Sequence, residues 1–250
     1  MEFPKTGNNT FLIIDQGNTL TKIALFDHDT LIWLRYFNKL SAHDVQQLEL
    51  DKINISAGII SSVAVHPSSL LSILPDTNWL ILDHNTPVPI TNRYHTPETL
   101  GNDRLAGAVA ASVLFTGSDV LVIDAGTAIT YDIVTGSKEY LGGSISPGLT
   151  IRFKGLNTFT GKLPLIESIS FNEITGYDTR ESILSGVMNG TRFEMDGFIR
   201  EYKEKYPDLR TILTGGDAIY FDKKLKSNIF AFPNLVIDGL KLILQYNLEK

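Results

Sequence analysis

The sequence contains no cysteine, and this absence removes several kinds of chemistry at once. With no cysteine among 250 residues, the chain forms no disulfide, no thiolate metal site and no cysteine nucleophile. It also lacks a Gly-x-x-x-x-Gly-Lys-Ser/Thr phosphate loop and a well-formed Gly-x-Ser-x-Gly hydrolase motif. The five histidines are scattered without ligand spacing, so we do not expect a histidine-based metal centre.

Basic patches and long apolar runs are missing as well. Lys and Arg number 22 against 28 Asp and Glu, for a formal net charge of -6, and no basic stripe stands out that would neutralise nucleic-acid phosphates. Residues 1–10 are polar and lack the basic start and apolar segment of a signal peptide. No apolar run approaches the length of a membrane span. We therefore expect a soluble cytoplasmic protein that binds neither nucleic acid nor a membrane.

What the chain does have is a pattern of strands followed by helices that occurs twice. Strands are predicted at 11–14, 23–26, 31–37, 57–63, 79–82, 120–124, 128–133, 139–144 and 211–214. Helices are predicted at 41–50, 67–74, 105–115, 147–157, 183–205 and 235–248. Because the pattern restarts near Gly117, it predicts an α/β fold with two domains, residues 1–117 and 118–250.

The first candidate site is the segment Asp15-Gln16-Gly17-Asn18-Thr19-Leu20-Thr21-Lys22, which follows the first predicted strand. A carboxylate at a strand end, followed by glycine and threonine, suits a metal-bound nucleotide phosphate. The carboxylate faces the cation, and backbone N–H groups can approach the oxygens. Lys22 can reach the same oxygens from the returning strand. The alternative is a tight hairpin in which Asp15 and Asn18 only satisfy turn amides, and this segment alone leaves both interpretations open.

The segment Asp124-Ala125-Gly126-Thr127-Ala128 repeats the order of apolar strand, aspartate, glycine and threonine. Two unrelated turns rarely agree in this way. The pair therefore favours a phosphoryl-transfer enzyme with a duplicated fold over two ordinary hairpins.

The segment Gly101-Asn102-Asp103-Arg104 opens a predicted helix. A helix N-terminus suits an anionic group of the acceptor substrate, and Arg104 offers a fork for a carboxylate or phosphate. Asp103 could accept a proton from an acceptor hydroxyl. The residues alone favour the simpler interpretation, a helix cap with a local Asp–Arg pair.

Two more glycine segments each leave two interpretations open. Gly142–Gly148 indicates either close backbone approach, to a ligand or to the partner loop, or a bulge before a proline-started helix. Gly215–Asp217 allows either the approach of an adenosine or a simple turn between strand and helix.

In this order, the segments resemble those of the type III pantothenate kinases, a branch of the acetate kinase–sugar kinase–Hsp70–actin superfamily. The resemblance runs from Phe11 to the terminal helix and depends on the ordered co-occurrence of segments that are individually weak. The segments are 15–22, Tyr94 with 96–100, 101–104, 124–128, 142–148, 163–164, Thr179 with Ser182 and 185–186, and 215–218.

The resemblance implies two ribonuclease-H-like (actin-like ATPase) domains with the nucleotide cleft between them. It implies ATP-dependent phosphorylation of pantothenate to 4'-phosphopantothenate, the first step of coenzyme A biosynthesis. Asp103 would then be the general base, which reverses the interpretation as a cap. The rivals are a related sugar or polyphosphate kinase, and a nucleotide-binding regulatory protein of the same fold without turnover, which would have no need of that base.

The resemblance also implies roles for the remaining candidate residues. The ATP phosphates would be held by Asp15, Gln16, Gly17, Asn18, Thr19, Leu20, Thr21, Lys22 and Thr127, with Asp15 near Mg²⁺. Asp124 would bind a monovalent cation, potassium or ammonium. Pantothenate would contact Tyr94, Gly101, Asn102, Asp103, Arg104 and Thr179. Because Thr179 would serve the neighbouring subunit's site, a homodimer with a shared active site is implied. Gln16 departs from the family pattern, in which an aliphatic residue is common, and residues 1–10 form a longer extension than usual.

Overall fold

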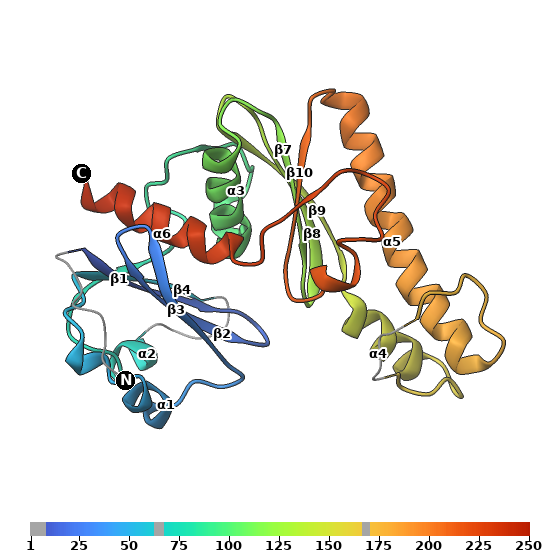
Figure 1. Cartoon of the computed structure of the whole chain (residues 1–250), viewed down its shortest axis with the longest axis horizontal. Coiled ribbons are helices and arrows are strands. Elements are labelled where there is room, and N and C mark those ends of the chain that lie inside the picture. The colour runs from blue at the N-terminus through green and yellow to red at the C-terminus, as the bar shows by residue number, and fades with distance from the viewer. Residues whose placement is uncertain (1–8, 63–67, 167–170) are drawn as a thin grey trace. The chain divides into compact units, whose positions relative to one another are not determined.

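The computed structural model describes residues 9–62, 68–166 and 171–250, and these fall into two compact units (Figure 1). The first unit combines the described residues up to Ala110 with the C-terminal segment Leu235–Lys250, and the second unit spans Ala111–Asn234. Helix α6 (Leu235–Leu248) thus belongs to the first unit, whereas the sequence pattern predicts it in the second half. A contiguous division after residue 117 stays a prediction about the duplicated halves.

The first unit is built on a five-stranded mixed sheet. Its strands are β1 (Thr10–Gln16), β2 (Thr21–Asp27), β3 (Thr30–Phe37), β4 (Ala57–Ser62) and β5 (Asn78–Ile81). They lie in the order β3-β2-β1-β4-β5; β1 to β3 form an antiparallel meander, and β4 and β5 run parallel to β1. The predicted meander is confirmed, and it brings Asp15 opposite Lys22 across the first hairpin.

One face of this sheet packs against short helices. They are α1 (Ala42–Gln47), the 3-10 turn η1 (Leu50–Lys52) and α2 (Ser68–Leu71). Buried Leu12, Ile14 and Ile60 meet Val45 and Leu70 in a single apolar cluster. Because side chains alternate along a strand, the neighbours of these residues, including Asp15, lie on the opposite face.

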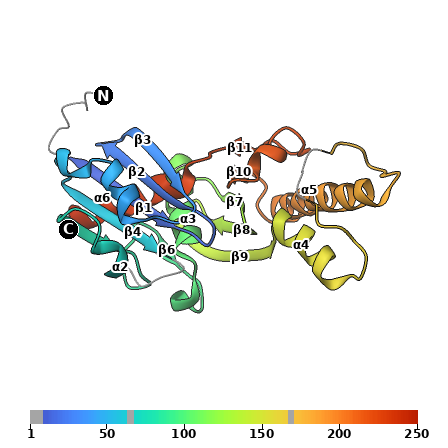
Figure 2. The same cartoon turned by 90° about the horizontal axis from the view of Figure 1, so that it is seen from below.

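Helix α6 contacts β1 and β4 in the first unit (Figure 2). The helix packs closely against the N-terminal half of α3 (Asn102–Leu114). The approach is so close that a Cβ at Gly239 would lie 1.9 Å from the carbonyl oxygen of Ala106. Only glycine permits that approach. The contact holds the N-terminal turn of α3, with Asp103 and Arg104, within the first unit.

The second unit repeats the topology of the first. Its strands are β7 (Val120–Ala125), β8 (Ala128–Val134), β9 (Glu139–Pro147), β10 (Arg210–Thr214) and β11 (Phe230–Ala231). Strands β7 to β9 form an antiparallel meander, and β10 and β11 run parallel to β7 in the order β11-β10-β7-β8-β9. The expectation of a duplicated α/β fold is therefore confirmed.

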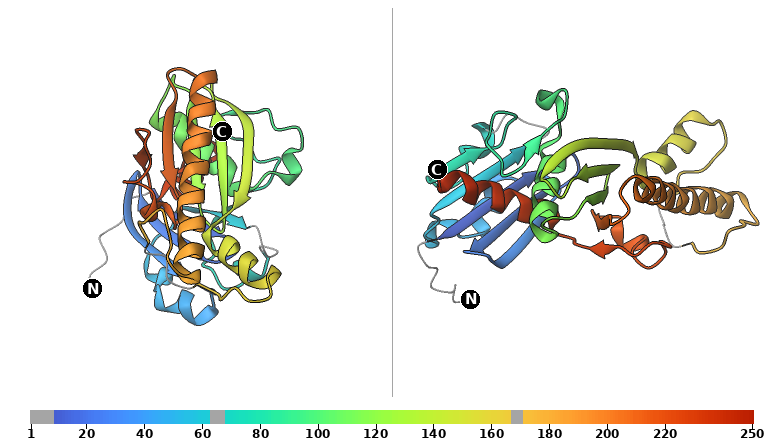
Figure 3. Two further views of the ribbon diagram at one scale, coloured as in Figure 1. Left: turned by 90° about the vertical axis from the view of Figure 1, so that its right-hand side faces the viewer. Right: turned by 90° about the horizontal axis from the view of Figure 1, so that it is seen from above.

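Two helices pack on the sheet of the second unit. They are α4 (Leu149–Phe159) and the 27-residue α5 (Thr179–Lys205), and Figure 3 shows the length of α5. Buried Leu184, Met188 and Met195 of α5 join Leu121 and Tyr131 of the sheet in one core.

Some predicted elements differ from the structure at their ends, for local reasons. The predicted helix 67–74 is reduced to α2, because the N–H groups of Ile73 and Leu74 bond three residues back and Pro75 then ends the turn. Helix α5 begins at Thr179, four residues before its predicted start, because Asp178 caps it by accepting a 2.7 Å hydrogen bond from the backbone N–H of Glu181.

Other differences are small. The expected helix after Thr214 is the single turn η3 (Ala218–Tyr220), and strand β9 continues to Pro147. The short elements β6 (Thr91–Asn92) and η2 (Pro97–Thr99) were not expected. Val63, His66 and Pro67, which the sequence analysis included, lie outside the described residues.

Candidate active site

The candidate residues of the first unit begin with Asp15, at the end of β1. The residue is buried, at 7% exposure, and the Lys22 Nζ lies 4.0 Å from its Oδ2. The turn between the two strands is closed by a backbone bond from Gly17 N–H to the Leu20 carbonyl. Because the backbone closes this turn by itself, the carboxylate of Asp15 is not needed to hold the turn.

Asp15 and Asp103 lie close enough to affect each other. Burial raises the pKa of Asp15 to about 6; Lys22 lowers it, and the negative charge of Asp103 raises it further. Two carboxylates that repel each other in a partly dry site favour a bound cation. The structure therefore brings together two of the acidic residues that the sequence analysis singled out.

Helix α3 and the loop before it assemble the other predicted residues of this unit. The Asp103 Oδ1 accepts a 2.8 Å hydrogen bond from the backbone N–H of Arg104, and the nearly buried Arg104 guanidinium lies 5.6 Å from the centre of the Tyr94 ring. Asn102 donates from Nδ2 to the Leu82 carbonyl at 3.0 Å. A Cβ at Gly101 would lie 2.5 Å from the Asp103 Oδ1, so a side chain there would displace the carboxylate.

These contacts describe Asp103 more closely than the sequence could. Asp103 lies in the first turn of α3, and its bond runs to the main-chain N–H of Arg104, so the interpretation of Asp103 as a cap at the helix end has a structural basis. The bond occupies one carboxylate oxygen at 2.8 Å, and a carboxylate has further acceptor sites. The turn therefore orients Asp103 without removing its capacity to take a proton.

The candidate residues of the second unit lie in a loop that is supported mainly by backbone. The loop after Asp124 is closed by a bond from Gly126 N–H to the Ala128 carbonyl, and the Thr127 carbonyl accepts from Gly148 N–H, both at 3.0 Å. A Cβ at Gly148 would lie 2.1 Å from the Gly126 oxygen. Of the two interpretations left open for segment 142–148, the structure shows close backbone approach at Gly148, here to the loop after Asp124. A register shift in the pairing of β8 and β9 near Gly142 shows that the segment also contains a bulge.

Gly215 approaches the same loop from another side. Its φ is +95°, and a Cβ there would lie 2.4 Å from both the Asp124 Oδ1 and the Ala125 oxygen. Asp217 N–H donates to the Ala125 carbonyl at 2.8 Å. The turn therefore acts as a support for the Asp124 loop, and its approach to an adenosine stays a prediction.

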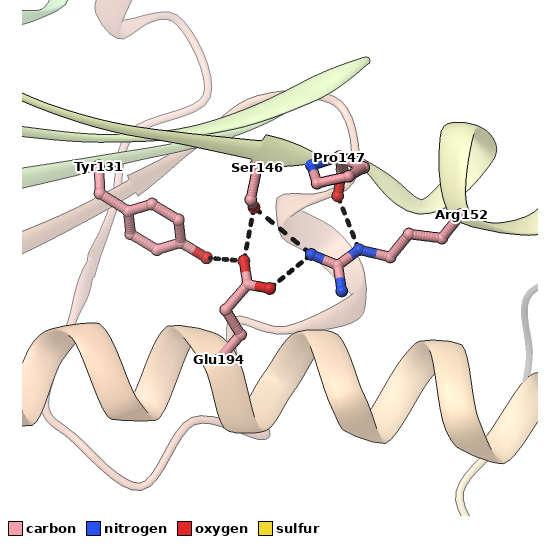
Figure 4. Close-up of polar contacts among 5 residues, drawn as sticks. All are labelled: Tyr131, Ser146, Pro147, Arg152 and Glu194. Atoms are coloured by element: carbon pink, nitrogen blue, oxygen red, sulfur yellow. Dashed lines mark hydrogen bonds and ion pairs between the residues drawn. The ribbon is translucent and has the colours of Figure 1, made fainter. Parts of the chain in front are cut away.

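Glu194 on α5 is the centre of a polar network that the sequence analysis missed (Figure 4). Its Oε1 accepts hydrogen bonds from the hydroxyls of Tyr131 at 2.9 Å and Ser146 at 2.5 Å, and its Oε2 pairs with Arg152 at 2.6 Å. Although burial raises the pKa of Glu194, these donors outweigh it and hold the pKa below its usual value. A glutamate beside Met195 on the apolar side of a long helix was the signal available in the sequence.

The network connects α5 to the segment Pro147–Gly148, which supports the loop that contains Thr127. The Arg152 Nε donates to the Pro147 carbonyl at 2.7 Å, and Pro147 precedes Gly148. Tyr131 also stacks on Phe198 of α5, with ring centroids 4.0 Å apart. The sheet, this segment and the long helix of the second unit are thereby fixed to one another.

Thr179 is the first residue of α5 and is exposed. It lines a cavity of about 900 Å³ between α4 and α5. Arg152, Leu156 and Val187 are also in its wall. The exposed position is consistent with contact to a molecule outside the unit.

The described residues hold no group of three or more acidic or histidine side chains suited to a metal ion. Mg²⁺ usually keeps several waters and takes one or two carboxylates from a protein. The Asp15 carboxylate, with Asp103 nearby, fits that demand. In the parts of the chain that the structure describes, no helix combines the length and hydropathy required to cross a membrane.

Comparison with known proteins gives a consistent result. The family model described as type III pantothenate kinase matches residues 11–201. The type III pantothenate kinase of Phocaeicola vulgatus is 46% identical over 239 residues, which cover 94% of this chain and 98% of that protein. The Bacteroides fragilis enzyme of the same name is 45% identical over 238 residues, with the same coverage of both chains.

Solved structures share the fold at low sequence identity. A Campylobacter jejuni protein assigned to the Baf family of transcriptional activators has a TM-score of 0.60 at 22% identity, covering 96% of this chain and all of that one. MreB5 of Spiroplasma citri, bound to ADP, has a TM-score of 0.50 at 12% identity, covering 97% of this chain and 99% of its own. Together with the family match and the two relatives, these findings confirm the actin-like ATPase fold and show that the chain belongs to the type III pantothenate kinase family, as a kinase that phosphorylates pantothenate in coenzyme A biosynthesis.

Proposed function

We propose that the chain transfers the terminal phosphate of ATP to pantothenate with Asp103 as the general base. The observation that supports this assignment is that Asp103 lies close enough to Asp15, at the end of β1, for its negative charge to raise the pKa of Asp15. Phosphoryl transfer needs alignment and charge neutralisation more than covalent catalysis. One carboxylate at the metal and a second at the acceptor hydroxyl meet that need.

In this proposal the segment from Asp15 to Lys22 holds the ATP phosphates. Mg²⁺, when bound near Asp15, would neutralise the charge that develops on the phosphoryl group. Lys22 adds a positive charge from β2, within 4.0 Å of the Asp15 carboxylate, and Gln16 is turned to the other face of the sheet, where its Oε1 accepts from the Ser62 hydroxyl at 2.9 Å. Only part of the segment therefore contributes side chains to the phosphates.

Tyr94, Gly101, Asn102 and Arg104 are proposed to bind pantothenate. The Arg104 guanidinium is already oriented by the Tyr94 ring, and a fixed guanidinium fork suits the carboxylate of pantothenate. The Asp103 carboxylate is oriented by the adjacent main chain, so that it can take the proton of the attacking hydroxyl.

The second unit contributes the remaining proposed residues. Thr127 assists with the phosphates, Asp124 binds potassium or ammonium, and Thr179 contacts pantothenate in the neighbouring subunit of a homodimer. The supported backbone around Asp124 and the exposed position of Thr179 are consistent with these roles. Sedimentation or light scattering tests the dimer, and rates in potassium and in sodium buffers test the cation.

The decisive experiment is Asp103→Asn. The amide keeps the size of the side chain but cannot take a proton, so we expect turnover to fall at least 100-fold, or about 2.7 kcal/mol. Calorimetry should show nearly unchanged ATP binding. Asp51→Asn, at an exposed aspartate of the same unit, is the matched control and should leave turnover unchanged.

Near-normal turnover of Asp103→Asn would remove this residue from the mechanism. The substrate is tested separately by measuring ADP release with pantothenate and with a panel of sugars. Turnover with a sugar and none with pantothenate would overturn the proposed acceptor.

A further inference from the structure

Ser61 lies at the end of β4, and its hydroxyl is buried without a hydrogen bond of ordinary geometry to any described residue. Its side chain has 0% exposure, and within the described part of the chain its hydroxyl has no hydrogen-bond partner of ordinary geometry. A buried hydroxyl that makes no hydrogen bond costs free energy, and alanine would avoid that cost. A buried polar group without an ordinary partner often belongs to a site that binds an ion or takes part in catalysis.

The neighbour of Ser61 is Asp15. The two residues are register partners on the parallel strands β1 and β4, so their side chains emerge on the same face of the sheet. The carboxyl ends of both strands lie together at this point, which is where α/β sheets bind ligands. Burial raises the pKa of Asp15 most strongly, and the Ser61 hydroxyl is close enough to lower it.

The next residue along β4 behaves differently. The Ser62 hydroxyl donates to the Gln16 Oε1 at 2.9 Å, and this pair lies on the opposite face of the sheet because side chains alternate. Two adjacent serines therefore end the same strand. Ser62 has a well-formed hydrogen bond, whereas Ser61 lies near Asp15 without a hydrogen bond of ordinary geometry among the described residues. Ser62 therefore stabilises the fold through its bond to Gln16, whereas Ser61 lies on the face of the sheet that carries Asp15.

We propose that the Ser61 hydroxyl is a positioning group for Asp15, donating a hydrogen bond to its carboxylate when magnesium and nucleotide are bound. The inference rests on the proposed role of Asp15 near Mg²⁺. A carboxylate at a metal has its second oxygen free for an outer hydrogen bond, and such bonds fix its orientation. Lys22 and Ser61 would then hold Asp15 from two adjacent strands.

The test is the variant Ser61→Ala, with Ser62→Ala as its matched control. Binding of a non-hydrolysable ATP analogue is measured by calorimetry with Mg²⁺ and with EDTA, and Tm is measured without ligand. We expect Ser61→Ala to weaken Mg²⁺-dependent binding roughly 10-fold, to leave binding in EDTA unchanged, and to keep or raise Tm. Ser62→Ala should lower Tm slightly and leave nucleotide binding unchanged.

If Ser61→Ala binds the Mg²⁺–analogue complex as tightly as the wild type, or loses affinity equally in EDTA, the proposal is wrong. Asp15→Asn provides the reference for the proposed function. If that variant loses Mg²⁺-dependent binding while Ser61→Ala does not, only the role of Ser61 fails; if Asp15→Asn also binds normally, the assignment of Asp15 itself fails.

Discussion

The two units place an aspartate and a glycine turn at the same point of the same meander, yet they build different surroundings for them. In the first unit, Asp15 is nearly buried and is surrounded by the side chains of Lys22, Ser61 and Asp103. In the second unit, the loop after Asp124 is supported by the backbone at Gly148 and Gly215. Duplicated topology therefore preserves the position of the acid, while the packing around it decides whether side chains or backbone shape the site.

This difference predicts that alanine is tolerated much better at Gly17, in the first unit, than at Gly148, in the second. A Cβ at Gly148 would lie 2.1 Å from the Gly126 oxygen, whereas a Cβ at Gly17 would lie 3.3 Å from the Leu20 oxygen. Gly148→Ala must displace backbone, and we expect a loss of roughly 3 kcal/mol in the free energy of unfolding, with Tm lower by about 6–12 °C. Gly17→Ala should lower Tm much less, and equal losses would contradict the comparison.

A smaller effect is expected where the second unit does depend on a side chain. Glu194→Ala leaves the guanidinium of Arg152 and two hydroxyls without their shared acceptor, and we expect a loss of about 2 kcal/mol. Glu194→Gln keeps an acceptor oxygen and should lose about half as much.

Glu201 provides the control on the same helix. It pairs with Arg200 at 3.5 Å, and its side chain is 68% exposed. Glu201→Ala should change the stability by less than about 0.5 kcal/mol in denaturant titrations. If both glutamates had equal effects, the network would add nothing beyond surface charge.

The sequence could predict the duplicated meander and the acidic strand ends because both depend on local patterns. Apolar runs separated by glycine turns are visible without tertiary information, and Asp15 and Asp124 follow such runs directly. The ordered motifs supplied the family. The predicted start of α5 was four residues too late. A single aspartate such as Asp178 does not mark a helix start in the sequence unless its bond to a backbone N–H is known.

Tertiary partners explain what the sequence could not predict. Nothing in the separation of Ser61 from Asp15 shows that β1 and β4 are adjacent. The Glu194 network gathers residues from β8, β9, α4 and α5, and the placement of α6 with the first unit depends on contact with β1. Long-range pairing of this kind leaves no periodic signal.

The smallest predicted effect concerns Asp15 and has a defined sign with pH. Because burial raises the pKa of Asp15 from 3.8 to about 6, its ionisation is harder in the folded state than in the unfolded state. The ligand-free protein therefore loses stability as the pH rises between these two values, and near pH 4 and below the effect disappears since both states bind the proton. The raised pKa corresponds to a loss of roughly 3 kcal/mol above pH 6. Asp15→Asn removes the charge but keeps a buried amide, which still has a desolvation cost, so we expect only part of this loss to be recovered and Tm to exceed that of the wild type by about 2–4 °C at pH 7.5.

Asp44→Asn is the control of opposite sign for this pH dependence. The Ser41 hydroxyl and backbone N–H hold the pKa of Asp44 below its usual value, so its charge stabilises the fold at neutral pH, and that stability is lost as the pH falls through the lowered pKa. Thermal melts from pH 4 to pH 8 should therefore show a Tm gain for Asp15→Asn that grows as the pH rises. The Tm loss of Asp44→Asn should stay nearly constant over the same range, because the pKa of Asp44 lies below its usual value of 3.8. A Tm gain for Asp15→Asn that is as large at pH 4 as at pH 7.5 would mean that the charge of Asp15 is not the cause and that the packing around its side chain is.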